Sequence, residues 1–287
     1  MMFSRKLDAA NRIARACLEA GLPKHGPMAE PMAYAVQGGK GLRGFLVIEG
    51  ARMFGIPDSA SRYPAAAIEA MHACSLVHDD LPCMDDDDLR RGQPTVHVKW
   101  DDATAVLVGD ALQSLAFELV ADPAAGSGDV RAELAVTLAQ GAGGLGMVLG
   151  QALDLAAEKA TRPLTLDEII ALQAGKTGAL FEWSAKAGAI LAQEDTEPLR
   201  AYGEALGLAF QIADDILDIE GDVAAVGKAL HKDQDAGKAT FVTLLGMAGA
   251  KHRAGELVEA ACDALLPYGQ KADNLRAAAH FSISRDN

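Results

Sequence analysis

Apolar residues recur every three or four positions along most of this 287-residue chain, between short loops. This spacing places them on one face of a helix, whereas a half-buried strand would alternate at every second position. Two stretches show it most clearly: Ile68, Met71, Ser75 and Leu76, and Leu206, Phe210, Ala213 and Leu217. Thr165 followed by Glu168 has the spacing of a capping box that begins a helix. The pattern predicts an all-α fold, an antiparallel helical bundle formed by residues 1–287 as a single domain.

Composition supports closely packed helices. Half of the residues are apolar and only 5% are aromatic, while alanine and glycine are abundant. Small side chains let helices approach one another, and runs of strand-forming Val, Ile and Thr are missing. Short loops are expected at residues 21–31, 55–64, 122–129, 161–165 and 193–198.

The net charge of −14 argues against nucleic acid as a partner, because no basic stripe is available to neutralise phosphates. An acidic protein can still bind an anionic substrate when metal ions lie between the two.

The cysteines and the N-terminal sequence indicate a cytoplasmic protein. The four cysteines form no C-x-x-C pair, and the charged N-terminal stretch has no apolar core of a signal peptide. The stretch from Leu134 to Leu153 carries no charge, but it contains five glycines. We therefore expect a buried core helix there and no transmembrane segment.

The first acidic cluster contains six aspartates within ten residues, which repel one another unless cations lie among them. A solvated acidic loop is the simpler interpretation of such a run. However, an apolar helical segment leads directly into Asp79 and Asp80, and Pro82 then ends the helix so that the chain can bring Asp85 back. Arg90 and Arg91 follow immediately and place anion-binding groups beside the carboxylates.

The second cluster lies within the apolar run from Leu206 to Ile219. Asp214 and Asp218 share one helix face, and Asp215 lies about 100° round the axis. Carboxylates on an apolar helix are costly unless they are paired or bind metal. A set of oxygen ligands without His or Cys favours magnesium over zinc. Two such clusters suggest facing helices that hold a diphosphate through magnesium ions.

Basic and amide groups accompany both clusters. The segment from Gly38 to Gly44 combines flexible glycines with Lys40 and Arg43, and His72 lies two helical turns before Asp79. Glycines let backbone amides approach a phosphate closely. The simpler interpretations, a flexible loop and a structural histidine, remain open for these residues. Lys176 and Thr177 lie in a helix of small residues, and Lys228, Lys232 and Lys238 follow the second cluster.

From about Gln37 to Thr243 the chain resembles the trans-prenyl diphosphate synthases, the polyprenyl synthetase family. HDDLPCMDDDDLRRG resembles the first aspartate-rich motif in its bacterial form, and FQIADDILD resembles the second. GGKGLR, GQALDL, GKTGAL and GKAT resemble further family motifs. The resemblance implies a helical bundle around a deep central cavity, commonly a homodimer, that condenses isopentenyl diphosphate with allylic diphosphates.

The resemblance also implies roles for individual residues. About three magnesium ions would bridge the allylic diphosphate and the carboxylates of Asp79, Asp80, Asp85, Asp214, Asp215 and Asp218. Contacts to the same diphosphate would come from Arg90, Lys176 and Lys238, with Lys228 also in the substrate site. Isopentenyl diphosphate would bind Lys40, Arg43, His72 and Arg91. The developing allylic cation would face Thr177 and Gln211, with the leaving diphosphate as the base.

Two departures from the family pattern are visible. The family usually has Arg and Pro where this chain has Gly41 and Gly44, which suggests a looser loop. Cys74 stands where fifteen-carbon synthases of the bacterial type usually carry a large aromatic residue that closes the tunnel. A twenty-carbon product, geranylgeranyl diphosphate, would then fit, although Met71 one turn below would restore the floor. Ser75 is small in either case. Farnesyl diphosphate remains the first expectation and geranylgeranyl diphosphate the alternative.

Three other classes of protein compete with this interpretation. A terpene cyclase would share the helices and the metal, but it usually lacks the second site formed by Lys40, Arg43, His72 and Arg91. A noncatalytic subunit of a heteromeric synthase tends to lose aspartates, and both clusters are complete here. An acidic scaffold that binds divalent ions leaves the paired cations unexplained.

Overall fold

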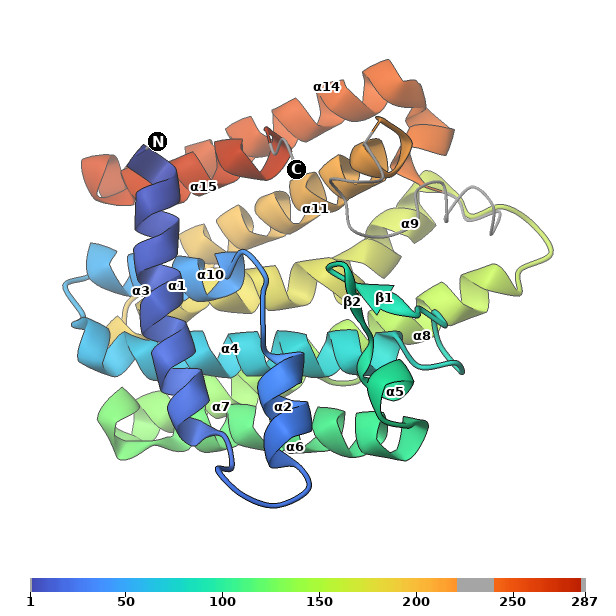
Figure 1. The fold of residues 1–287 in the computed structure, drawn as a ribbon. Helices are drawn as coiled ribbons and strands as arrows, with labels where there is room; N and C mark the ends of the chain where they lie inside the picture. Colours follow the sequence, from blue (N-terminus) through green and yellow to red (C-terminus); the bar gives the residue numbers. More distant parts are fainter. Residues whose placement is uncertain (1, 221–239, 285–287) are drawn as a thin grey trace. The chain divides into compact units, whose positions relative to one another are not determined.

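The computed structural model describes residues 2–220 and 240–284, and nearly all of its regular structure is helical (Figure 1). The all-α prediction is confirmed. In chain order the elements are α1 (Met2–Gly21), α2 (Ala29–Ala35), α3 (Leu42–Met53), α4 (Asp58–Asp79), β1 (Leu89–Arg90), β2 (Gln93–Pro94), α5 (Val96–Lys99), α6 (Asp102–Ala121), η1 (Pro123–Ala125), α7 (Gly128–Ala142), α8 (Met147–Glu158), α9 (Leu166–Gln173), η2 (Ala174–Gly178), α10 (Ala179–Ala192), α11 (Glu197–Glu220), α14 (Phe241–Ala264), η3 (Leu266–Ala272) and α15 (Asp273–Ile283).

Contacts divide the chain into two compact units. The first unit comprises residues 1–136 and 187–194, and the second comprises residues 137–186 and 195–287. The first unit contains the aspartates that follow α4, and the second contains those on α11.

Helix α4 of the first unit packs against α1, α3 and α6. Its buried face is rich in alanine, which lets these neighbours lie close. Near its C-terminal end, His78 Nε2 donates a hydrogen bond to the Val106 carbonyl of α6 at 3.1 Å. A Cβ atom at Gly109 would lie 1.9 Å from this ring nitrogen, so any other residue there would displace the His78 ring.

Helix α4 begins earlier than expected. Residues 55–64 were expected to form a loop, but the helix starts at Asp58 and contains Pro64. Proline removes one hydrogen-bond donor but keeps a helical φ, and Pro64 is buried against the core. Burial of this apolar ring therefore compensates for the missing helical bond.

A short antiparallel hairpin follows the first acidic cluster, with Leu89 opposite Pro94 and Arg90 opposite Gln93. Its two loop residues, Arg91 and Gly92, have φ values of 54° and 72°. Positive φ at both positions is typical of a type I′ turn. The Tyr34 hydroxyl donates to the Pro94 carbonyl at 2.7 Å and ties the hairpin to α2.

In the second unit, α11 packs against α14, α15 and η2. Two glycines of α11 permit very close contacts: a Cβ atom at Gly203 would lie 2.6 Å from Glu182 Cα, and one at Gly207 would lie 2.9 Å from Gly178 Cα. The buried Tyr202 hydroxyl donates to the Leu275 carbonyl of α15 at 2.8 Å. These contacts fix α11, which carries the second aspartate cluster.

The prediction of one buried core helix from Leu134 to Leu153 is wrong. Helix α7 ends at Ala142 and α8 begins at Met147, because a glycine-rich turn interrupts the run. Several apolar side chains of this stretch are exposed, with Leu145 81% exposed. By length and composition alone, Asp102–Ala121 and Gly128–Glu158 would each suffice to cross a membrane, which is weak evidence because core helices meet the same criteria.

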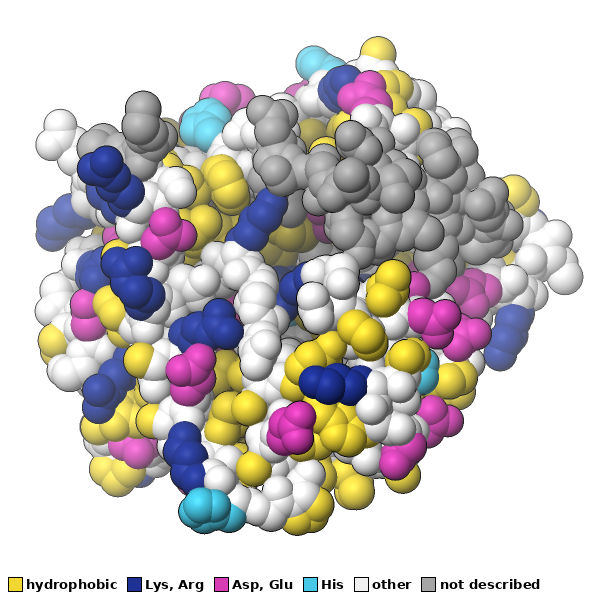
Figure 2. Space-filling model, in the orientation of Figure 1, with side chains coloured by type: hydrophobic (Ala, Val, Ile, Leu, Met, Phe, Trp, Pro, Cys, Tyr) yellow, Lys and Arg dark blue, Asp and Glu magenta, His cyan; other side chains and the backbone are white. Residues whose placement is uncertain are grey.

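The face drawn in Figure 2 carries both signs of charge. On it, lysine and arginine side chains are distributed in small groups among acidic and hydrophobic ones.

Candidate functional site

The first aspartate cluster forms a tight turn at the C-terminal end of α4. Asp79 is the last residue of the helix, and the Asp85 amide donates to the Asp79 carbonyl at 2.9 Å. Asp87 N–H likewise donates to the Asp80 carbonyl at 3.2 Å. Asp86 takes a left-handed φ of 51° at the apex. The structure therefore brings Asp85 back to Asp79, as the position of Pro82 predicted.

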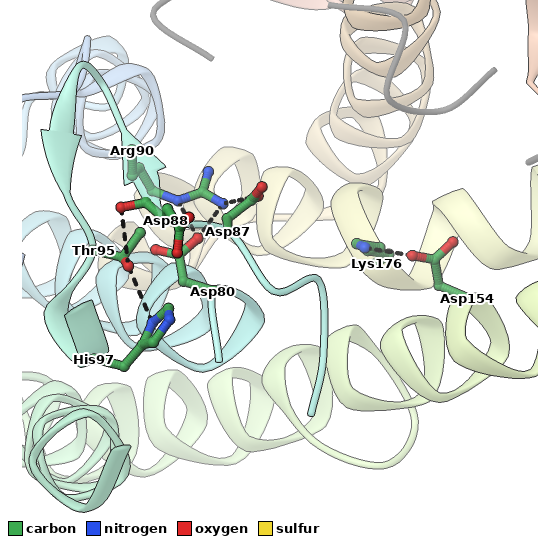
Figure 3. Close-up of polar contacts among 8 residues, drawn as sticks. All are labelled: Asp80, Asp87, Asp88, Arg90, Thr95, His97, Asp154 and Lys176. Atoms are coloured by element: carbon green, nitrogen blue, oxygen red, sulfur yellow. Dashed lines mark hydrogen bonds and ion pairs between the residues drawn. The ribbon is translucent and has the colours of Figure 1, made fainter. Parts of the chain in front are cut away.

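Arg90 lies against this turn. Its Nε donates to Asp80 Oδ1 at 2.7 Å, and one of its terminal nitrogens lies 3.4 Å from Asp87 Oδ2 (Figure 3). Asp80 is only 3% exposed. Burial raises the pKa of Asp80 above its usual range, and the hydrogen bond from Arg90 opposes this rise. Arg90 therefore stabilises the charged form of Asp80 and fixes the hairpin beside the acidic turn.

The start of α5 supports the same hairpin. Thr95 N–H donates to the Asp88 carbonyl at 3.0 Å, and the Thr95 hydroxyl lies 3.1 Å from His97 Nδ1. These contacts anchor both ends of the segment that carries Arg90 and Arg91.

Arg91 crosses the glycine segment that precedes α3. Its guanidinium donates to the Gln37 carbonyl at 2.9 Å. Gly38 and Gly39 have positive φ, and a Cβ atom at Gly39 would lie 2.8 Å from an Arg91 terminal nitrogen. These glycines thus make room for an arginine side chain of the chain itself. Lys40 is exposed in the same segment.

Gly41 and Gly44 do not leave empty space. Gly41 has a φ of 63°, and a Cβ atom there would lie 2.6 Å from the side chain of Asn11 on α1. A Cβ atom at Gly44 would lie 3.2 Å from Ala14 Cβ. Helix α1 therefore packs against both positions. The sequence suggested a looser loop at these two glycines, and the structure instead shows close contacts there.

His72 lies near three arginines. Burial lowers the pKa of His72 well below its usual value, and the positive charges of Arg43, Arg91 and Arg90 lower it further. The imidazole is therefore neutral at physiological pH. Such a group can offer one N–H donor without adding charge.

The three residues proposed to set chain length lie on the same helix. Met71 and Cys74 are 1% and 2% exposed. Burial raises the pKa of Cys74 to about 12, so its thiol stays protonated. The Ser75 hydroxyl donates to the His72 carbonyl at 2.9 Å and is satisfied within α4.

In the second unit, Lys176 and Thr177 lie in η2, a π-helical turn between α9 and α10. Single π turns inside α-helices are frequent at functional sites. Lys176 Nζ lies 2.6 Å from Asp154 Oδ2 of α8, and Figure 3 shows the two side chains directed toward each other. A Cβ atom at Gly150 would lie 1.9 Å from the Lys176 backbone nitrogen, so only glycine allows α8 to approach this closely.

Thr177 begins a chain of hydrogen bonds. Its hydroxyl donates to Gln211 Oε1 at 2.9 Å, and Gln211 Nε2 donates to Asp215 Oδ1 at 3.0 Å. Asp215 Oδ2 in turn accepts from the Phe241 N–H at 2.9 Å, at the start of α14. The structure thus brings together Thr177, Gln211 and Asp215 and orients the amide between the other two.

The donor set of both clusters consists of carboxylates alone. Asp215 and Asp218 are 5% and 8% exposed, and Asp214 is half-buried one residue before Asp215. Within residues 2–220 and 240–284, no three Asp, Glu, His or Cys side chains form a preformed metal centre. This arrangement fits magnesium, which is usually held by one or two carboxylates together with waters and substrate phosphates.

Two predicted substrate-binding residues, Lys228 and Lys238, lie outside the described residues, as does Lys232.

Three residues at these sites were not singled out from the sequence. Asp154 pairs with Lys176, Asp87 contacts Arg90, and Glu69 accepts from the Gly44 amide at 2.7 Å. Asp154 lies within GQALDL, so that motif was the available signal. Nothing local marks Glu69, because its partners come from another helix.

Known proteins match the whole chain. Residues 25–266 match the polyprenyl synthetase family. The chain is 45% identical to a farnesyl diphosphate synthase of Haemophilus influenzae, over 99% of this chain and 98% of the relative. The apo crystal structure of an FPP/GFPP synthase from Zymomonas mobilis has a TM-score of 0.90 at 42% identity, with 98% of both chains covered.

A geranyltransferase from Helicobacter pylori, complexed with magnesium and isoprenyl diphosphate, has a TM-score of 0.81 at 31% identity. The match covers 97% of this chain and 96% of that one.

Proposed function

Because the chain belongs to the polyprenyl synthetase family, we propose that it condenses isopentenyl diphosphate with dimethylallyl and geranyl diphosphates to give farnesyl diphosphate. The match to a farnesyl diphosphate synthase over 99% of the chain carries this proposal. The chain is a prenyltransferase of the short-chain trans class. Residues 1–287 would act as one catalytic domain.

The proposed metal is magnesium, with about three ions as the family resemblance implies. In the first unit Asp79 and Asp85 would hold magnesium, with Asp80 contributing or holding Arg90 in place. In the second unit Asp214, Asp215 and Asp218 would do so. When bound, magnesium would supply positive charge to the leaving diphosphate.

The chain's own cations would bind the two substrates. Arg90 and Lys176 are proposed to contact the allylic diphosphate, together with Lys228 and Lys238. Lys40, Arg43 and Arg91 are proposed to bind isopentenyl diphosphate, and neutral His72 would donate one hydrogen bond to it. Arginine suits this task because its planar guanidinium can donate two parallel hydrogen bonds to a phosphate.

Ionisation of the allylic carbon–oxygen bond would leave a carbocation, which the double bond of isopentenyl diphosphate attacks before a proton is lost. The Thr177 hydroxyl donates to Gln211, so the hydroxyl oxygen keeps lone pairs that can face the cation. Dipoles held in place before the reaction need no reorganisation when charge develops. The departing diphosphate would take the proton.

Geranylgeranyl diphosphate is the alternative product, and Cys74 is the observation that favours it. Its side chain is small, and it lies on α4 five residues before Asp79. Met71, buried one turn earlier on α4, is the residue proposed to limit the product to fifteen carbons.

We further propose a homodimer in the cytoplasm. Apolar side chains exposed on α6, such as Leu107 at 55%, support a contact with a second copy.

The deciding experiment incubates the purified protein with magnesium, dimethylallyl diphosphate and isopentenyl diphosphate, and measures product length by mass spectrometry. We expect a fifteen-carbon product. A twenty-carbon product would favour the alternative, and replacing Cys74 with Tyr should then shorten it to fifteen. The proposal would be rejected if the protein formed no elongated product and if Asp79→Ala and Asp214→Ala gave the same result as the unchanged protein.

A further inference from the structure

The N-terminus of α3 is capped by a side chain from another helix. Gly41 precedes α3 and has no side chain to serve as a cap. The first helical bond runs from Phe45 N–H to the Gly41 carbonyl at 2.9 Å, so the Gly44 amide lies one residue too early to have a helical acceptor. Glu69 Oε1 of α4 accepts this amide at 2.7 Å. A carboxylate at this position also interacts favourably with the helix dipole.

The same carboxylate interacts with two of the cations proposed to bind isopentenyl diphosphate. Burial raises the pKa of Glu69, whereas the Gly44 amide and the charges of Arg43 and Arg91 lower it. Arg43 lies beside Gly44 in the first turn of α3, and His72 lies one turn after Glu69 on α4. Glu69 thus links the elements that carry Arg43 and His72, and its charge attracts both Arg43 and Arg91.

This link depends on a backbone N–H at position 44. Proline, which the family usually has here, carries no N–H and would place its ring where the Glu69 oxygen lies. A Cβ atom at Gly44 would lie 3.2 Å from Glu69 Oε1, so alanine fits with a small adjustment of that side chain and keeps the N–H. The capping bond is therefore a property of this chain and accompanies its departure from the family pattern.

We propose that Glu69 is a positioning residue for the isopentenyl diphosphate site, acting through the Gly44 amide on Arg43 and through its charge on Arg43 and Arg91. The inference rests on the proposed function. It does not give Glu69 a contact with the substrate.

Two substitutions separate the two actions of Glu69. Glu69→Gln removes the charge but keeps an acceptor, and Gly44→Pro removes the donor but keeps the charge. Proline is tolerated in the first turn of a helix because no helical bond is lost there. Gly44→Ala retains the amide and is the matched control for the proline. Glu118→Gln, an exposed position on α6, is the control for the loss of charge.

Steady-state kinetics with geranyl diphosphate and isopentenyl diphosphate provide the readout, with circular dichroism to check folding. We expect KM for isopentenyl diphosphate to rise about tenfold in Glu69→Gln and to rise less in Gly44→Pro, because only Glu69→Gln removes the negative charge that attracts Arg43 and Arg91. KM for geranyl diphosphate and kcat should stay within about twofold, and both controls should match the unchanged protein.

An unchanged KM for isopentenyl diphosphate in either test variant would overturn the proposal. Equal effects on both substrates, or a loss of thermal stability alone, would also overturn it by indicating a general structural role. If Gly44→Pro does not fold, calorimetric titration of Glu69→Gln with isopentenyl diphosphate alone decides, and unchanged affinity rejects the proposal. Failure of the unchanged protein to elongate any substrate would instead reject the proposed function.

Discussion

At the scale of single residues, two of the cations proposed to bind diphosphates already have carboxylate partners within the chain. Arg90 contacts Asp80 and Asp87, and Lys176 contacts Asp154. Such pairs hold long side chains in one orientation before a substrate arrives. An incoming diphosphate must therefore either displace the carboxylate or bind the cation alongside it.

Replacing Asp154 with Asn should impair both stability and turnover. The Lys176 ammonium would lose a charged partner in a partly buried environment, where breaking an ion pair is costly. We expect the free energy of unfolding to fall by about 1–3 kcal/mol, the typical cost of leaving a buried polar group without its partner. Turnover should fall about tenfold or more, because the orientation of Lys176 is lost.

Urea unfolding and steady-state kinetics measure these two effects. Asp8→Asn, at an exposed position in the interior of α1, is the matched control and should change neither. Unaltered stability and turnover in Asp154→Asn would show that the ion pair has no role in either.

Some residue contacts were predictable from sequence and others were not. The return of Asp85 to Asp79 followed from Pro82, because a proline ends a helix locally. The Glu69 contact joins residues 25 positions apart on different helices. Such pairs depend on how the helices pack, and helical periodicity does not fix that packing.

At the scale of elements, glycine determines where the helices of the second unit touch. Gly150 lets α8 lie directly against the backbone of η2. Replacing Gly150 with Ala places a Cβ atom 1.9 Å from the Lys176 nitrogen, so the two segments must separate. Overpacking of this kind costs about 1–3 kcal/mol of unfolding free energy.

Gly255→Ala on α14 is the matched control, because a Cβ atom there meets no neighbour within 4 Å. It should stabilise the protein by about 0.5–1 kcal/mol through helix propensity. Chemical denaturation of both variants tests the contrast, and equal stability changes would contradict the proposed role of Gly150.

Local signals predicted some helix boundaries correctly. The capping box at Thr165 is present, with both of its hydrogen bonds formed. The break between α7 and α8 was not predicted. The uncharged stretch suggested one continuous helix, although its glycines are residues that often end helices. The π turn at residues 174–178 has no sequence signature, since it depends on packing against α8 and α11.

At the scale of the whole molecule, the helical periodicity was sufficient to predict the fold class, and the motifs were sufficient to predict the family. The proposed homodimer is a further property at this scale. Size-exclusion chromatography with light scattering should give about twice the chain mass of 29.9 kDa. Exposed apolar side chains on α6 would be covered in such a dimer, because apolar surface is driven out of water.

Replacing Leu107 with Glu should shift the protein toward the monomer, because a charge would be buried without a partner. Leu266→Glu, at a leucine of η3 that is 68% exposed, is the control and should remain dimeric. A monomeric unchanged protein would contradict the proposed homodimer.

The π turn at residues 174–178 also affects how the length of this chain can vary. A π turn holds one more residue than an α-helical turn, so deleting a residue within it would restore ordinary α-helix. The helical segments on its two sides would keep nearly the same angular relation, because the turn already accommodates the extra residue. Leu172 and Leu180, both buried, could then both keep their places. We therefore infer that this segment tolerates the loss of one residue more readily than the α-helices beside it, where a deletion rotates the following residues by about 100°.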